Sequence, residues 1–144
     1  MAIAFDGAIL VPAADPDDGE ATARALAPRL GPESEILIVH VIEKGGGAPD
    51  KAPLESRKEY AQQVFGRTRA PLEDTGATIE TEILYGTDVV ETIYESGAER
   101  KAEAVAFVPR KANRLMEMLS GNTTRRMIRE ATLPVIVLPV NDVE

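Results

Sequence analysis

The chain has 144 residues, a formal net charge of −8 and no cysteine. Without cysteine it has neither disulfides nor thiolate metal sites, and its acidic balance argues against a nucleic-acid-binding protein, which needs a basic face. No apolar stretch approaches the roughly 18 residues of a membrane span, and no secretion signal is evident. We therefore expect a cytoplasmic protein that contacts no membrane and forms a single domain over residues 1–144.

Short apolar runs alternate with amphipathic segments along the chain. The apolar runs predict strands near residues 8–13, 35–42, 77–84, 104–108 and 134–140. The segments between them predict four helices. The first has Asp15 as N-cap and Pro16 as its first residue, the second begins near Leu54, residues 86–88 (Gly-Thr-Asp) open the third, and the fourth begins at Gly121. Unbroken apolar strands separated by helices favour an α/β protein whose parallel sheet is covered on both faces.

Three segments resemble the universal stress protein family. Residues 9–12 (Ile-Leu-Val-Pro) match its opening strand, residues 40–41 (His-Val) the end of its second strand, and residues 134–138 (Pro-Val-Ile-Val-Leu) its closing strand. The resemblance covers nearly the whole chain. It implies a Rossmann-like, five-stranded parallel sheet in the order 3-2-1-4-5, a homodimer and, in one subset of the family, ATP binding.

The chain departs from the nucleotide-binding members of that family at several positions. Where those members end the first strand with an acid that contacts the base, this chain has Ala14. Of the three glycines in the family's C-terminal signature, Gly121 fits the last, whereas Val108 and Lys111 replace the first two, and Asn122 stands where a serine or threonine follows. Since a Cβ atom restricts the backbone where a phosphate must approach closely, the resemblance implies a degenerate signature and the loss of ATP binding of the usual kind.

The predicted start of the fourth helix is the remaining candidate for ligand binding. Amide groups at a helix N-terminus and the helix dipole favour an anion, which nearby basic side chains could cover. The alternative interpretation is a set of solvated charges with Asn122 as a simple N-cap. No metal or cofactor is required, and an adenine nucleotide such as ATP would bind weakly. The candidate ligand-binding residues are Gly121, Asn122, Thr123, Arg110, Lys111, Arg125 and Val41.

Other chemical signals are weak. The acidic segment from Asp15 to Glu20 lacks the glycine and glutamate spacing of a calcium loop and is more typical of a helix start. His40, the only histidine, lies among apolar strand residues and favours a structural role over that of a base. No catalytic motif is evident. The favoured hypothesis is a non-enzymatic stress-response or regulatory protein that contacts other proteins; a nucleotide or anion binder and an unrecognised hydrolase or transferase are the alternatives.

The last strand is the candidate dimer interface. In the order 3-2-1-4-5 it forms an edge of the sheet, and it carries no charge between Pro134 and Val140. An uncharged apolar edge invites pairing with another chain, and a second copy related by a two-fold axis would cover it. The predicted interface residues are Val135, Ile136, Val137 and Leu138.

Overall fold

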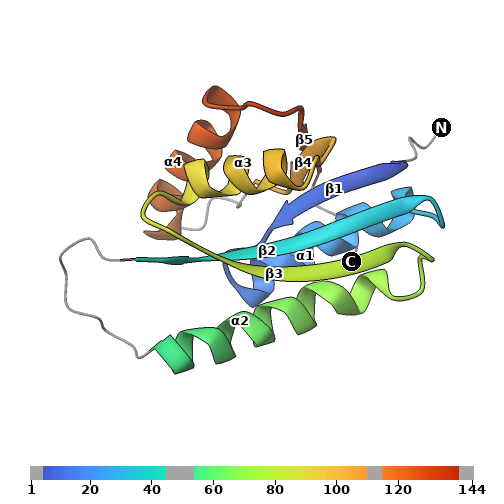
Figure 1. Cartoon of the computed structure of the whole chain (residues 1–144), viewed down its shortest axis with the longest axis horizontal. Helices are drawn as coiled ribbons and strands as arrows, with labels where there is room; N and C mark the ends of the chain where they lie inside the picture. The colour runs from blue at the N-terminus through green and yellow to red at the C-terminus, as the bar shows by residue number, and fades with distance from the viewer. Residues whose placement is uncertain (1–4, 45–53, 110–114, 140–144) are drawn as a thin grey trace.

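The computed structural model describes residues 5–44, 54–109 and 115–139, and gives only the backbone of residues 115–121. Strands and helices alternate along the described chain (Figure 1). The strands are β1 (Gly7–Pro12), β2 (Ser34–Glu43), β3 (Thr78–Gly86), β4 (Ala104–Phe107) and β5 (Val135–Val137). The helices are α1 (Pro16–Leu26), α2 (Leu54–Arg69), α3 (Val89–Glu99) and α4 (Leu115–Arg129), with short 3₁₀ turns η1 (Ala27–Arg29) and η2 (Ala70–Leu72) after the first two.

The strands form one parallel sheet in the order β3-β2-β1-β4-β5. At its centre Leu10 of β1 lies opposite Leu37 of β2 on one side and Val105 of β4 on the other. The order confirms the predicted α/β architecture. It also means that the chain winds outward from β1 in both directions, first through β2 to β3 and then through β4 to β5.

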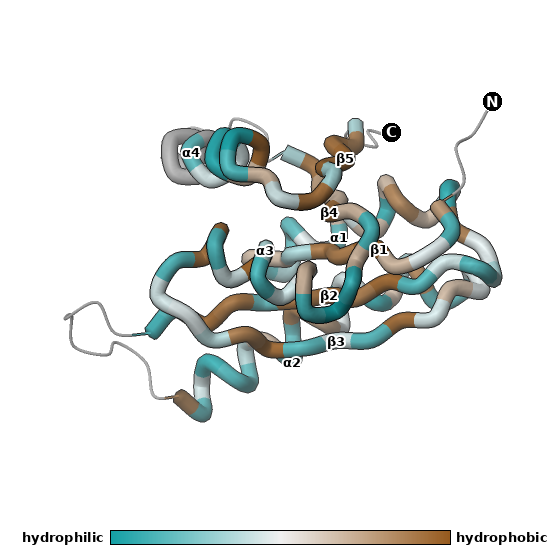
Figure 2. Tube along the Cα trace, turned by 45° about the horizontal axis from the view of Figure 1, so that its top comes forward, coloured by the Kyte–Doolittle hydropathy of each residue, from teal (hydrophilic) through white to brown (hydrophobic). Residues whose placement is uncertain are grey.

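Two hydrophobic clusters cover the two faces of the sheet. Because successive strand residues point to opposite faces, Ile9 and Val11 join one cluster while Leu10 joins the other. The first cluster takes its helical residues from α1 and α2, and the second takes them from α3 and α4. Figure 2 shows the hydrophobic residues gathered along the strands that lie between these helices. The prediction of helices on both faces is therefore confirmed.

Two predicted boundaries are wrong. The fourth helix begins at Leu115, six residues before the predicted start at Gly121. Residues 115–120 (Leu-Met-Glu-Met-Leu-Ser) contain strong helix formers, so the helix runs through Gly121 at a cost of about 1 kcal/mol relative to alanine. The last strand covers only Val135–Val137, because Pro134 and Pro139 have no N–H group to donate to a neighbouring strand.

Candidate functional site

A cavity of about 470 Å³ lies at the carboxyl ends of β1, β2 and β4. Between β1 and β4 the direction of winding reverses, and in open α/β sheets this reversal point leaves a crevice where ligands bind. We call this cavity the crevice. A second hollow of about 560 Å³ lies beside η1 and η2, away from these strand ends, and no aromatic side chain lines it.

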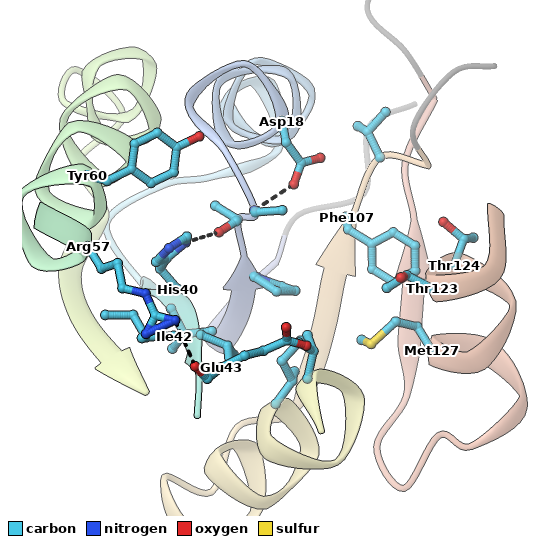
Figure 3. A pocket seen from close by; sticks show the side chains of 18 residues that line it. Asp18, His40, Ile42, Glu43, Arg57, Tyr60, Phe107, Thr123, Thr124 and Met127 are labelled. Carbon is cyan, nitrogen blue, oxygen red and sulfur yellow. Dashed lines mark hydrogen bonds between the residues drawn. The ribbon is translucent and has the colours of Figure 1, made fainter. Parts of the chain in front are cut away.

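Apolar side chains form most of the crevice (Figure 3). Figure 3 shows His40 and Tyr60 on one side and Phe107 and Met127 on the opposite side, so that aromatic rings face the space from both walls. An apolar cavity with a few convergent polar groups is the usual form of a small-molecule site. The apolar lining residues are Pro12, Ala13, Ala14, Val39, Val41, Ile42, Val89, Ile93, Phe107, Val108 and Met127.

The turn from β1 into α1 forms one rim of the crevice. Asp15 is the N-cap of α1, as predicted, and its Oδ1 accepts a hydrogen bond from the backbone N–H of Asp18 at 2.8 Å. The Oδ2 of Asp18 in turn accepts from the backbone N–H of Ala14 at 2.9 Å. These reciprocal bonds hold the Asp18 carboxylate at the rim, four residues beyond Ala14.

His40 is part of the crevice wall as well as of the core. The residue is only 8% exposed, and Nδ1 of its ring lies 2.8 Å from the carbonyl oxygen of Ala13. A carbonyl oxygen can only accept, so Nδ1 carries the proton, and in the neutral ring Nε2 is left as an acceptor. The ring also meets the Tyr60 ring edge-on, with centroids 5.9 Å apart. These contacts agree with the structural role that the sequence favoured, and they fix the tautomer.

Helix α2 supplies a polar wall that the sequence analysis missed. The guanidinium of Arg57 donates from Nη2 to the backbone carbonyl oxygen of Glu43 at 3.1 Å, and Arg57, Glu43 and Tyr60 all line the crevice. Arg57, Tyr60, Ala61 and Val64 recur at three- and four-residue spacing, so they share one helix face. That spacing, continued from the buried residues Ala61 and Val64, was the available signal.

Only some of the predicted ligand-binding residues line the crevice. Val41 and Thr123 line the crevice, and Thr124 joins them. Gly121 and Asn122 lie in the middle of α4, where backbone N–H groups bond to carbonyls four residues earlier, so the premise of free amides at a helix start is wrong. Arg125 is exposed and does not line the crevice. Arg110 and Lys111 lie outside the described residues.

The carboxyl-terminal part of α4 is tied to α3 beside the crevice. The Nη2 of Arg126 lies 3.0 Å from the Oδ2 of Asp88, the N-cap of α3, and its Nε lies 2.9 Å from Glu130. The backbone N–H of Glu91 and then the Arg126 guanidinium hold the pKa of Asp88 below its ordinary value. The buried hydroxyl of Tyr94 donates to the backbone carbonyl of Met127, and burial raises the pKa of Tyr94. We call Asp88, Tyr94 and Arg126 the α3–α4 latch.

Within the part of the chain that the structure describes, no group of three or more histidine, aspartate or glutamate residues could hold a metal ion. In the same residues no helix is long and apolar enough to cross a membrane.

Comparison with known proteins agrees with the fold. The model of the universal stress protein family matches residues 7–139. The chain belongs to this family. A universal stress protein of Methanocaldococcus jannaschii is 26% identical over 112 residues, which are 74% of this chain and 65% of that relative. The chain therefore matches just under two thirds of that relative's length.

Solved structures of this family share the fold. A universal stress protein from Archaeoglobus fulgidus gives a TM-score of 0.69 at 20% identity, covering 93% of this chain and 98% of that one, and its structure in complex with dAMP is also known. A family protein from Arabidopsis thaliana with AMP bound gives a TM-score of 0.66 at 12% identity, covering 94% and 92%.

Two positions at which the chain departs from nucleotide-binding family members, Val108 and Ala14, lie in the described structure beside the crevice. Val108, which replaces the first signature glycine, is buried, and its backbone N–H donates to the hydroxyl of Thr22 at 3.2 Å. The N–H group of Val108 therefore already has a hydrogen-bond acceptor within the protein. Ala14 is exposed at the rim and contributes only a methyl group to the crevice.

Proposed function

We propose that this protein is a non-enzymatic, cytoplasmic stress-response protein that acts as a homodimer and binds a small adenine-containing ligand weakly in the crevice. The apolar crevice at the reversal point of the sheet, faced by aromatic rings on two walls, is the observation that carries this proposal. The AMP and dAMP complexes of the Arabidopsis and Archaeoglobus proteins support an adenine compound as the ligand class.

Triphosphate binding of the usual family kind is lost under this proposal. Helix α4 offers no free amides at residues 121–123, and the Val108 amide already has a partner in Thr22. Added phosphates therefore find no backbone donors at these positions. Among the described residues that line the crevice we find no catalytic constellation: His40 is the only histidine of the chain, and its Nδ1 is hydrogen-bonded to the carbonyl oxygen of Ala13.

Calorimetry with AMP and with ATP plus magnesium tests the ligand, and a phosphate-release assay tests for hydrolysis. We expect AMP to bind in the high micromolar to millimolar range, ATP to bind no more tightly, and no phosphate to be released. Ala14→Trp should block AMP binding by filling the rim, whereas the matched change of an exposed alanine on α3, Ala98→Trp, should not. Submicromolar, magnesium-dependent ATP binding would contradict the proposal, and steady phosphate release would favour the enzyme hypothesis.

The proposed homodimer is built on β5. This strand is the last of the sheet order, and Val137 is 48% exposed; Ile128 on the neighbouring helix α4 is 53% exposed. Ile136 packs against the cluster under α1 and α2, and Leu138 is buried, so these two predicted interface residues serve the core of the subunit.

A further inference from the structure

Arg57 brings a positive charge into the wall of the crevice. It lies in the first turn of α2, and it is partly buried among the residues that line the cavity. Tyr60 lies three residues further along the same helix face and lines the crevice too. Figure 3 shows both side chains on the same side of the space as His40. A ligand in the crevice can therefore meet an aromatic ring and a cation of the same wall.

One hydrogen bond orients the Arg57 guanidinium. Its Nη2 donates to the backbone carbonyl oxygen of Glu43, the last residue of β2, at 3.1 Å. A guanidinium carries five N–H groups in one plane, so this bond fixes the direction of the group and leaves further donors for a ligand. A side chain that is already oriented loses less conformational freedom when a ligand binds.

No acidic side chain of the described residues forms an ion pair with Arg57. Glu43 contacts the guanidinium through its backbone carbonyl, and the structure records no ion pair between the two side chains. Several other arginines in the described part of the chain are paired with aspartate or glutamate: Arg24, Arg67, Arg100 and Arg126. In a chain with a net charge of −8, an arginine that lines a cavity without such a pair is a candidate anion-binding group.

From these contacts we infer that Arg57 binds the phosphate of a nucleoside monophosphate whose base lies between the aromatic walls of the crevice. A planar guanidinium can donate two N–H groups to two phosphate oxygens, and the rings of Tyr60 and Phe107 face the space that the base would fill. The phosphate subsite then belongs to α2. The inference rests on the proposed ligand-binding role of the crevice and adds the residue that holds the charged group.

Calorimetric titration of the full chain with AMP and with adenosine, at low salt and at several hundred millimolar sodium chloride, tests the inference. We expect AMP to bind about three- to tenfold more tightly than adenosine at low salt, as for one charge-assisted contact at a solvated site. The Glu43 carboxylate, which also lines the crevice, keeps this advantage small. Salt should weaken AMP binding, because it screens the attraction, and should leave adenosine binding almost unchanged.

Charge variants at neighbouring positions of α2 assign the effect to Arg57. Arg57→Gln should bring the affinities for AMP and adenosine close together and remove the salt dependence of AMP binding. Arg57→Lys should keep the salt dependence and weaken AMP binding by about two- to threefold, because lysine retains the charge without the planar donors. Lys58→Gln removes the same charge from the next residue, which does not line the crevice, and should leave the preference for AMP unchanged.

The outcomes separate the inference from the function on which it rests. Wild-type protein that binds AMP and adenosine equally would overturn the inference and leave the ligand-binding function standing. A preference for AMP that survives Arg57→Gln would assign the phosphate to other residues and overturn the inference too. An equal loss of both ligands in Arg57→Gln and in Arg57→Lys would indicate a purely structural role and contradict it. Failure of both ligands to bind at millimolar concentration would overturn the function and the inference together.

Discussion

Gly19 of α1 and Thr68 of α2 lie in close contact where the two helices pack together. A Cβ atom added at Gly19 would lie 1.9 Å from the Oγ1 of Thr68, which is fully buried and donates to the carbonyl of Val64. Only a hydrogen atom fits between the helices here. The close contact matters for the crevice because α1 and α2 carry two of its rim residues, Asp18 and Tyr60.

Gly19→Ala should therefore destabilise the protein by about 1–3 kcal/mol through overpacking, measured by urea unfolding. The matched control is Gly66→Ala in α2, where an added Cβ meets nothing within 4 Å, and this change should stabilise by about 0.5–1 kcal/mol. Thr68→Ala combined with Gly19→Ala should recover part of the loss. Equal stabilities of the two single variants would contradict the close packing of α1 on α2.

The α3–α4 latch connects two secondary-structure elements, the N-terminus of α3 and the C-terminal part of α4. Asp88 caps α3 through the backbone N–H of Glu91 and also pairs with Arg126 of α4, so one carboxylate orders two helices. The pKa of Asp88 is lowered in the folded protein, so its contribution is present above its unfolded pKa and is lost as the pH falls through its folded value.

Asp88→Ala should cost about 1 kcal/mol at pH 7, the usual cost of losing an N-cap. Asp88→Asn should cost less, since asparagine still caps a helix and the partly exposed pair with Arg126 adds little. Thermal unfolding as a function of pH checks the sign: the difference between wild type and Asp88→Ala should shrink below about pH 4. A difference that grows on acidification would contradict this role.

The elements differ in how far the sequence could predict them. Strands such as residues 36–42 were predictable because an unbroken apolar run fits a sheet covered on both faces, and α1 was predictable because Asp15 and Pro16 are strong start signals. The start of α4 was not, because Gly121 suggested a boundary, whereas five strong helix formers in residues 115–119 extend the helix toward the N-terminus. The wall formed by Arg57 was missed because its spacing from Ala61 and Val64 indicates a shared helix face but does not indicate that this face borders a cavity.

At the scale of the whole molecule, β5 leaves one edge of the sheet unpaired among the described residues. The opposite edge, β3, carries Glu80 and Glu82, which pair with Arg100, and charged side chains protect an edge from further pairing. Strand β5 has no such charges, and its exposed valine at position 137 faces outward. This asymmetry favours dimerisation through β5 over pairing through β3.

Val137→Asp should shift the protein to a monomer in sedimentation velocity at tens of micromolar while leaving its far-ultraviolet circular dichroism unchanged. Thr81→Asp, which places the same charge at an exposed site on β3, is the control and should leave the dimer intact. Ile136→Lys is a poorer test, since Ile136 packs against the core cluster and its loss would also weaken the fold. Sedimentation of the wild-type protein as a monomer at these concentrations would contradict the proposed dimer.

The central claim is that an adenine compound binds in the crevice between the carboxyl ends of β1 and β4. Titration of ¹⁵N-labelled protein with AMP, followed through backbone amide shifts, tests it most directly. We predict saturable shifts at Ala13, Val41 and Thr123, all of which line the crevice, and none at Thr75 beside η2. Shifts confined to the surroundings of Thr75, or no shifts at millimolar AMP, would contradict the claim.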